Sequence, residues 1–334
     1  MSHPAGLRLA IDMMSGDAGL TVTMPACRSV LESEPGLELL ACGDPAAMSQ
    51  QLQSWPSALA QRLEIIEADS VLAADAGAAQ ALRRGSDSSL GRSLQLLANG
   101  RAVATVSAAG TGAMMVLSRH LLGMLPGIDR PALMAAIPTP TGSVWLLDLG
   151  ANINVDARRL CEFAHLGHVA LSVLSGSTPT IGLLNIGTEP GKGPDVLREA
   201  ARLIEASTAL DYRGFVEADQ VFAGVVDLVV CDGFAGNILL KSAEGAVGLM
   251  FAELKKRFAG SLCGLLAKSR LASLHDSLDP ARHNGAPLLG LRGTVIKSHG
   301  GTSAAGFAHA IRLAMQETRR GVAGAMESQL WAAD

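Results

Sequence analysis

Residues 229–241, VVCDGFAGNILLK, pass from an apolar run through an acid, two glycines and an amide into a helical pattern. Glycine lets the backbone approach a ligand closely, and the first turn of a helix offers unpaired N–H groups to an anion. Asp232, Gly233 and Gly236 therefore suit a bound phosphate. Asn237 has two open roles, because its side chain could cap the helix or donate an N–H to a developing oxyanion.

The same corner, a strand that ends in a polar residue followed by glycine, recurs five more times. Each glycine could make only a tight turn, but the repetition favours a shared anion site. Ligands of open α/β sheets bind beyond the carboxyl ends of the strands, so we expect these loops to converge on one crevice. The candidate phosphate or substrate ligands in these corners are Asp12, Gly16, Asp17, Ser107, Thr111, Gly112, Asn152, Gly187 and Lys297.

Three side chains could supply positive charge or a proton at such a site. Lys192 stands between two glycines in NIGTEPGKGPD, just before a predicted helix. Lys297 and His299 follow an apolar strand in TVIKSHGGTS and precede a predicted helix start, so both should point into the crevice. A lysine can meet phosphate as a point charge, whereas an ordinary loop lysine is simply solvated.

Signatures of nucleotides, metals and activated nucleophiles are missing from the sequence. There is no G-x-x-x-x-G-K-[ST], and no strand is followed by G-x-G-x-x-G with an acid about 20 residues on. The phosphate should therefore belong to something smaller than a dinucleotide. No G-x-S-x-G elbow occurs, and the five cysteines lie far apart. We expect no metal and no cofactor.

The composition is that of an aliphatic globular protein. Of 334 residues, 49% are hydrophobic, 17% are charged and only 3% are aromatic. The net charge of -4 and the scarce aromatic side chains argue against nucleic acid as a partner. The N-terminal residues show no secretory signal, and the segment 163–188 is too polar to span a bilayer. Dispersed cysteines fit a reducing cytosol, so we expect a cytoplasmic location.

The candidate residues must be positioned by alternating strands and helices. Short runs rich in Val, Ile and Leu alternate with stretches of helical period, which predicts a mostly parallel sheet in one α/β unit over 1–334. We expect strands at 7–12, 37–43, 62–66, 102–107, 132–137, 144–149, 180–186, 225–231 and 293–297. We expect helices at 22–33, 87–99, 112–123, 157–174, 194–207, 236–253 and 303–320.

Residues 253–284 break this rhythm and predict an inserted amphipathic helical hairpin. The segment is basic at its front and then places leucines near helical spacing. Such an element can pack against a partner chain, lie on an anionic lipid surface or attract an acidic protein. Its candidate membrane or carrier-protein contacts are Lys255, Lys256, Arg257, Leu262, Leu265, Leu266 and Lys268.

In their order and spacing, these motifs resemble the bacterial PlsX family of phosphate acyltransferases over almost the full length of the chain. The resemblance is carried by AIDMMSGDAG, VSAAGTGA, LDLGANI, LLNIGTEPGKG, VVCDGFAGNILLK and NGAPLLGLRGTVIKSHG. Two motifs depart from the family's pattern. Ser15 and Leu20 replace a glycine and a proline, and Ala109 and Gly110 replace a glycine and an asparagine.

The resemblance implies a three-layer α/β/α fold with a mostly parallel sheet, similar to that of isocitrate and isopropylmalate dehydrogenases. It implies transfer of a fatty acyl group from acyl-[acyl-carrier-protein] to inorganic phosphate, without a cofactor, for phospholipid synthesis. The implied partners are a second copy of the chain, acyl carrier protein, the inner face of the membrane as a peripheral contact, and a downstream acyl-phosphate:glycerol-3-phosphate acyltransferase.

Four of the candidate residues would have defined roles in that reaction. Lys192, together with Lys297, would offset the charge of phosphate and orient one oxygen toward the thioester carbonyl. Asn237 would stabilise the tetrahedral oxyanion, and His299 would protonate the leaving thiol or only anchor phosphate.

Other functions stay open from the residues alone. A phosphotransacetylase-like enzyme would take acyl-CoA as donor on the same scaffold. A decarboxylating dehydrogenase would need an aspartate cluster for a metal and a nicotinamide site, and the sequence shows neither. A catalytically weakened membrane scaffold for a downstream acyltransferase would account for the altered SAAGTGA loop.

Overall fold

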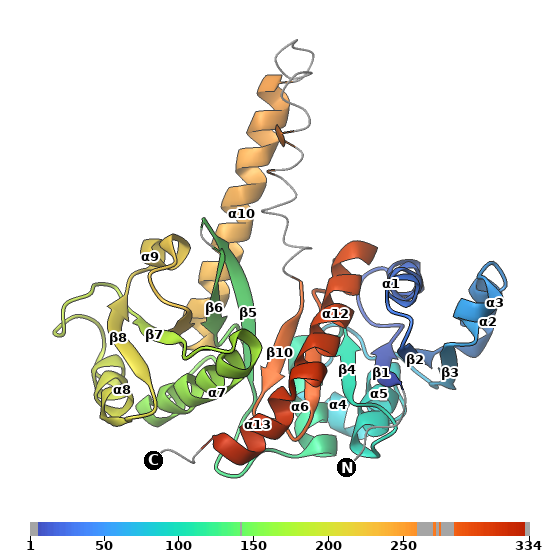
Figure 1. Ribbon diagram of the computed structural model, residues 1–334, viewed down its shortest axis with the longest axis horizontal. Helices are drawn as coiled ribbons and strands as arrows, with labels where there is room; N and C mark the ends of the chain where they lie inside the picture. The colour runs from blue at the N-terminus through green and yellow to red at the C-terminus, as the bar shows by residue number, and fades with distance from the viewer. Residues whose placement is uncertain (1–5, 141, 259–269, 272–273, 275–283, 331–334) are drawn as a thin grey trace.

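The computed structural model describes residues 6–140, 142–258, 270–271, 274 and 284–330 of the chain. Its centre is an 11-stranded sheet in the order β3-β2-β1-β4-β11-β10-β5-β6-β9-β7-β8. Helices cover both faces of this sheet and give three α/β/α layers (Figure 1). The expected fold class, a large and mostly parallel sheet between two helical layers, is confirmed.

The strands follow the short apolar runs of the sequence. All of the predicted strands are present, and β1 and β2 have their predicted bounds, whereas β8 and β10 were not predicted. The strands are β1 (Leu7–Asp12), β2 (Leu37–Gly43), β3 (Leu63–Glu67), β4 (Ala104–Ser107), β5 (Ala132–Thr139), β6 (Gly142–Leu147), β7 (Thr180–Leu184), β8 (Asp211–Val216), β9 (Leu228–Val230), β10 (Ala286–Leu289) and β11 (Thr294–Lys297).

The helices divide into one layer on each face of the sheet. Side chains alternate along β9, so Leu228 and Val230 pack with α7 and α8 on one face, and Val229 packs with α6 and α10 on the other. The helices are α1 (Leu20–Ser33), α2 (Pro45–Leu52), α3 (Ser57–Ala60), α4 (Ala78–Arg84), α5 (Ser89–Ala98), α6 (Thr111–Leu122), α7 (Ala157–Ser175), α8 (Asp195–Ala206), α9 (Ala218–Ala223), α10 (Gly233–Phe258), α12 (Ala304–Arg320) and α13 (Val322–Gln329).

Two groups of parallel strands in the sheet run in opposite directions. Strands β3, β2, β1, β4 and β11 are parallel to one another, and so are β6, β9, β7 and β8. Between the groups, β10 is antiparallel to β11 and to β5, and β5 is antiparallel to β6. The carboxyl ends of the two groups therefore do not lie at one edge. The two antiparallel strands reverse the second half of the sheet, so the loops expected to converge on one crevice leave the sheet at two different edges.

Helix α10 connects the two groups. It begins directly after β9 and continues for 26 residues. In Figure 1 its first part passes β5 and β6, and its remainder projects away from the sheet. The predicted hairpin begins inside this helix, since Lys255, Lys256 and Arg257 form its last turn. Its predicted contacts Leu262, Leu265, Leu266 and Lys268 lie outside the described residues.

Membrane-spanning helices were searched for among the described residues. No helix there is both long enough and apolar enough to cross a bilayer.

Glu317 is a buried acid on α12 whose replacement should stabilise the protein. Burial raises the pKa of this carboxyl from 4.5 to about 8. Between these values the folded state binds more protons than the unfolded chain, so the free energy of unfolding falls as pH rises. We expect Glu317→Gln to remove that loss. The variant should exceed wild type in free energy of unfolding by almost nothing at pH 4.5 and by on the order of 4 kcal/mol at pH 8. Urea unfolding between pH 5 and 8 measures the trend; a gain that does not grow with pH contradicts it.

Candidate active site

A cavity of about 760 Å³ lies between α10, strand β5 and the loop that follows β11. One wall is apolar and comes from β5 through Leu133, Ala135 and Ile137. Four of the predicted site residues line the same cavity, together with two charged residues that were not predicted. The predicted residues are Thr111, Asn237, Lys297 and His299, and the two further charged residues are Lys241 and Glu244.

Asn237 faces this cavity with a free amide. Helix α10 is capped by Asp232, whose Oδ1 accepts from the backbone N of Ala235 at 2.7 Å. Asn237 is therefore not the cap, which removes one of its two possible roles. Its side chain is exposed and makes no hydrogen bond to another described residue. An amide with unused N–H groups in a cavity is suited to stabilise negative charge.

The glycines at the start of α10 set how closely the helix approaches the end of β6. A Cβ at Gly236 would overlap the carbonyl oxygen of Asp148, so no larger residue fits unless the helix moves. The backbone N of Gly233 donates to the carbonyl of Asn152 at 2.8 Å. In this structure Gly233 and Gly236 thus make backbone contacts that place Asn237, and direct contact with phosphate stays a prediction for both.

One face of α10 lines the cavity. Asn237, Lys241 and Glu244 follow one another at four and three residues along the chain, which places them on the same side of the helix. The Nζ of Lys241 lies 2.7 Å from Oε2 of Glu244 and 3.2 Å from Nε2 of His299. The helix therefore carries residues from the carboxyl end of β9 to the carboxyl end of β11.

Lys297 is a partly buried lysine at the end of β11. Its Nζ donates to the backbone carbonyl of Ser298 at 3.0 Å. Burial, together with the nearby charge of Lys241, lowers the pKa of Lys297 from 10.5 to about 8. The side chain is thus a cation at neutral pH that mild alkali can neutralise.

His299 lines the cavity and is held in place by hydrogen bonds of its backbone and of its ring. Its backbone N donates to Oδ1 of Asn284 at 2.9 Å, and its Nδ1 accepts from the backbone N of Gly301 at 3.1 Å. Burial and then the charge of Lys241 lower the pKa of His299. The ring is therefore neutral over more of the physiological pH range than a free histidine.

Asn284 positions this loop and was missed by the sequence analysis. Its Nδ2 donates to Oγ of Ser298 and to the carbonyl of Gly306, both at 2.8 Å. The buried amide thus ties the loop after β11 to the start of α12. It was overlooked because it falls at the end of the segment 253–284, which was predicted as a hairpin.

Predicted ligands from the first strands hold the neighbouring loops together. Asp12 is buried, and its Oδ2 accepts from Oγ of Ser107 at 2.6 Å, which joins the ends of the adjacent strands β1 and β4. The backbone N of Asp17 donates to the carbonyl of Gly300 at 2.9 Å. Gly16 has a φ of 92° and packs against this contact. Phosphate contacts by these residues, and by Gly112 in the first turn of α6, stay predictions.

Asn152 belongs to a buried corner built on Asp148. The Asp148 carboxylate accepts from the backbone N of Leu133 at 2.8 Å and from Nδ2 of Asn152 at 3.1 Å. Burial raises the pKa of Asp148, and these hydrogen bonds oppose the rise. Because Nδ2 of Asn152 also donates to the carbonyl of Pro131 at 2.9 Å, both amide hydrogens are used within the corner. A ligand contact by Asn152 stays a prediction.

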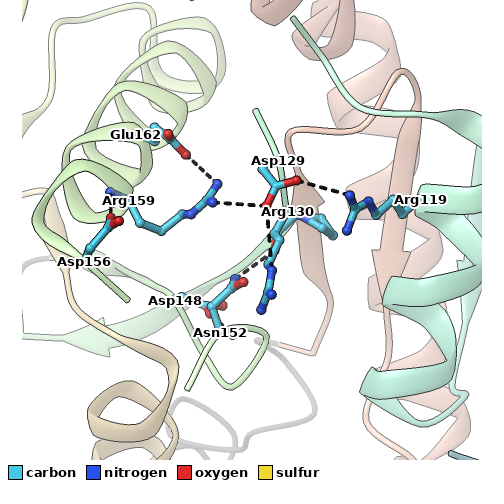
Figure 2. A network of polar contacts seen from close by, with 9 residues as sticks. Arg119, Asp129, Arg130, Asp148, Asn152, Asp156, Arg159 and Glu162 are labelled. Carbon is cyan, nitrogen blue, oxygen red and sulfur yellow. Dashed lines mark hydrogen bonds and ion pairs between the residues drawn. The ribbon is translucent and has the colours of Figure 1, made fainter. Parts of the chain in front are cut away.

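An ion-pair network surrounds Asp129. Figure 2 shows it beside the Asp148 corner, with Asp129 between Arg119 and Arg159. Arg159 also pairs with Glu162 one turn further along α7, at 2.6 Å. These pairs link α6 and α7 across the segment that leads into β5, the strand of the apolar wall.

Lys192 lies apart from the cavity in this structure. It is exposed on the loop after β7 and is not among the residues that line the cavity. Nδ2 of Asn185 donates to the Lys192 carbonyl at 3.1 Å, and Gly187 is buried against the side chain of Lys192. The structure thus does not bring Lys192 together with Lys297, and its phosphate role stays a prediction.

Metal ligands were sought among the described residues. No group there of three or more His, Cys, Asp or Glu side chains could hold a metal ion. The expectation of a reaction without metal or cofactor stays a prediction.

Comparison with known proteins assigns the chain to a family. A family model described as "Fatty acid synthesis protein" matches residues 7–325. The phosphate acyltransferase of Pseudomonas aeruginosa is 43% identical over 326 residues, covering 96% of this chain and 97% of the relative. That of Pseudomonas putida is 44% identical with the same coverage. The chain belongs to the PlsX family of phosphate acyltransferases.

Solved structures extend the likeness of this PlsX-family chain at the level of the fold. A phosphotransacetylase from Streptococcus pyogenes matches with a TM-score of 0.60 at 20% identity, covering 97% of this chain and 95% of that one. A 4-hydroxythreonine-4-phosphate dehydrogenase from Klebsiella pneumoniae matches with a TM-score of 0.55 at 14% identity, covering 95% and 99%. The expected likeness to a dehydrogenase fold is confirmed.

The departure at Gly110 has a local cause in this member of the PlsX family. A Cβ at Gly110 would overlap the backbone carbonyl oxygen of Ala74, so the preceding loop rests directly on the glycine. An asparagine, which the family's pattern has here, would require that loop to move. Any side chain at this position would therefore start in space that the backbone of Ala74 occupies.

Proposed function

We propose that this PlsX-family protein transfers a fatty acyl group from the thioester of acyl carrier protein to inorganic phosphate. The products are acyl phosphate and carrier protein with a free thiol, which supply phosphatidic acid synthesis. The observation that carries the proposal is the composition of one cavity. The free amide of Asn237, the cationic Lys297 and the apolar wall of β5 face the same space.

The polar lining residues support attack by phosphate on a thioester carbonyl. A phosphate oxygen forms a bond to the carbonyl carbon, and the carbonyl oxygen becomes an oxyanion that the Asn237 amide stabilises. Lys297 offsets the charge of phosphate and orients it. The carbon–sulfur bond then breaks, the electron pair leaves with sulfur, and the thiolate takes up a proton. Phosphate is itself the nucleophile, so no activated serine or cysteine is needed.

The neutral His299 has two possible tasks in this reaction. It can give a proton to the departing thiolate, or it can donate a hydrogen bond that anchors phosphate. A thiolate is a good leaving group, so the proton is not essential for bond cleavage. The anchoring task agrees with the fixed position of the ring on Asn284 and Gly301.

The apolar wall supports a fatty acyl chain as the transferred group. Leu133, Ala135 and Ile137 from β5 face the cavity, and Leu240 and Val247 from α10 border it. Pockets for apolar ligands are lined in this way, with a few polar groups that fix orientation.

The exposed end of α10 supports the proposed partners. Its last turn is basic through Lys255, Lys256 and Arg257, which suits an acidic carrier protein or an anionic membrane surface. Leu249 and Met250 are exposed on the same helix. A second copy of the chain, peripheral contact with the inner membrane and delivery to a downstream acyltransferase are parts of the proposal.

The deciding experiment measures turnover of purified protein with palmitoyl-[acyl-carrier-protein]. We expect free carrier protein and acyl phosphate, trapped as a hydroxamate, to appear only when inorganic phosphate is added. Turnover with palmitoyl-CoA but not with the carrier thioester would favour a phosphotransacetylase-like activity. Absence of turnover with both donors would favour the scaffold.

Lys192 can be tested in the same assay. The loop after β7 lies beside the start of α10, since β7 and β9 are neighbouring strands. If this loop closes over the cavity when phosphate binds, Lys192→Ala should raise the KM for phosphate about tenfold through the loss of one charge-assisted contact. A KM within twofold of the wild-type value would remove Lys192 from the site.

A further inference from the structure

Three residues with nitrogen donors line one cavity. The Nζ of Lys241 lies 3.2 Å from Nε2 of His299, and Lys297 belongs to the same lining. The charge of Lys241 contributes to the lowered pKa of both Lys297 and His299, so all three groups influence one another. Such a concentration of donors is costly unless an acceptor serves them.

The hydrogen bonding of His299 shows which donor lacks an acceptor. Gly301 N–H donates to Nδ1, so the neutral ring carries its proton on Nε2. The Nε2–H then faces the ammonium group of Lys241, which is also a donor, so the two groups do not form a hydrogen bond with each other. Among the described residues, Lys241 has an acceptor in Glu244 and Lys297 has one in the Ser298 carbonyl, but the Nε2–H of His299 has none.

We propose that Lys241 is a phosphate-binding residue, which Glu244 holds in the free protein and which turns to the acceptor phosphate when that anion enters between Lys241, Lys297 and His299. This inference rests on the proposed function and adds a residue to which no role was assigned. A phosphate ion offers several acceptor oxygens at once, so it can accept from the Nε2–H of His299 and from further N–H groups of the two lysines.

The pairing with Glu244 is suited to a holding role. The two side chains are three residues apart on α10 and are 48% and 29% exposed. An ion pair so open to solvent is weak, so a doubly charged anion can displace the carboxylate. The i, i+4 spacing also places Lys241 one helical turn from Asn237, so that phosphate held by Lys241 lies beside the carbonyl that Asn237 would receive.

The experiment compares wild type with Lys241→Met, Lys241→Arg and Glu244→Gln, using inorganic phosphate as the probe. Arg28→Met on α1 is the matched control, because it also removes a cation from an exposed helical ion pair, with Glu32. Phosphate binding is measured without acyl donor as the rise in Tm on adding phosphate, which depends on binding to the folded state. The KM for phosphate and the KM for acyl carrier are then measured separately.

We expect Lys241→Met to raise the KM for phosphate by about tenfold or more and to reduce the phosphate-induced rise in Tm. Lys241→Arg should retain most of the affinity, and Glu244→Gln should lower the KM about twofold, because the competing carboxylate is gone. The KM for acyl carrier should stay within twofold in every variant, and Arg28→Met should match wild type.

Two outcomes overturn the inference while leaving the proposed function intact. One is a wild-type KM for phosphate in Lys241→Met. The other is a rise confined to the KM for acyl carrier, which would place the lysine on the phosphodiester of the carrier's prosthetic arm. Failure of the proposed function looks different, because wild type itself would then show neither phosphate-dependent turnover nor a phosphate-induced rise in Tm.

Discussion

Replacing Asn237 by alanine is expected to lower the rate of acyl phosphate formation by a factor of about 100 to 1,000, the usual loss when one oxyanion donor is removed. The physical reason is that the free amide lies in the cavity and Asp232 already caps the helix. Because the donor acts mainly on the transition state, kcat should fall while the KM values for phosphate and acyl carrier change little.

The measurement is steady-state turnover of acyl carrier with saturating phosphate. Asn237→Asp is informative, because it keeps the shape of the side chain but replaces the N–H donors with a negative charge, and it should be as inactive as alanine. Asn99→Ala, at the exposed C-terminal end of α5, is the matched control and should retain wild-type activity. Activity of Asn237→Ala within threefold of wild type would falsify the oxyanion role.

Lys297 should make phosphate binding depend on pH. A lysine whose pKa is about 8 is charged below that pH and loses its charge as pH rises through it. The KM for phosphate should therefore rise by up to about tenfold per pH unit above pH 8, until other contacts limit the loss. Lys297→Arg keeps its charge at all these pH values and should flatten the profile. An unchanged KM for wild type from pH 7 to 9.5 would contradict the prediction.

The same residue should show opposite effects on stability and activity. Its pKa is lowered from 10.5 to about 8. At neutral pH the ammonium charge is therefore less favourable in the folded protein than in the unfolded chain. Between those values the unfolded chain binds more protons, and stability rises with pH. Lys297→Met should raise the free energy of unfolding at pH 7 by up to about 3 kcal/mol. The same substitution should also weaken phosphate binding. A Lys297→Met variant that is less stable than wild type and fully active would contradict both expectations.

The local elements were largely predictable because their causes are local. The runs LRLAID and LELLACG are purely aliphatic strands, and β1 and β2 have their predicted bounds. Strand β8, DYRGFV, was missed because it carries charges and a glycine, and β10, APLL, because it is short and contains proline. Helix α10 continues past the predicted end at residue 253, because the basic residues there were assigned to a separate hairpin.

The arrangement of the site was only partly predictable, because it depends on strand direction. Asn237, Lys297 and His299 were predicted and do line one cavity. Lys241 was hidden, because it ends the apolar run ILLK and its neighbour His299 is 58 residues further along the chain. Nothing in the sequence showed that β10 and β5 reverse the second half of the sheet. Lys192 and Asn237 follow neighbouring parallel strands of that half, yet only Asn237 lines the cavity.

Helix α10 is one continuous helix that joins Asn237, the proposed oxyanion donor, to the exposed basic last turn. Asn237 and Lys255 are separated by about 27 Å at 1.5 Å per residue. A twist of the helix by about 20° would move a side chain about 5 Å from its axis by roughly 2 Å, which exceeds the tolerance of a hydrogen bond. If Asn237 is the oxyanion donor, a partner bound to the projecting half of α10 would therefore have to leave the helix in its present rotation for turnover to proceed.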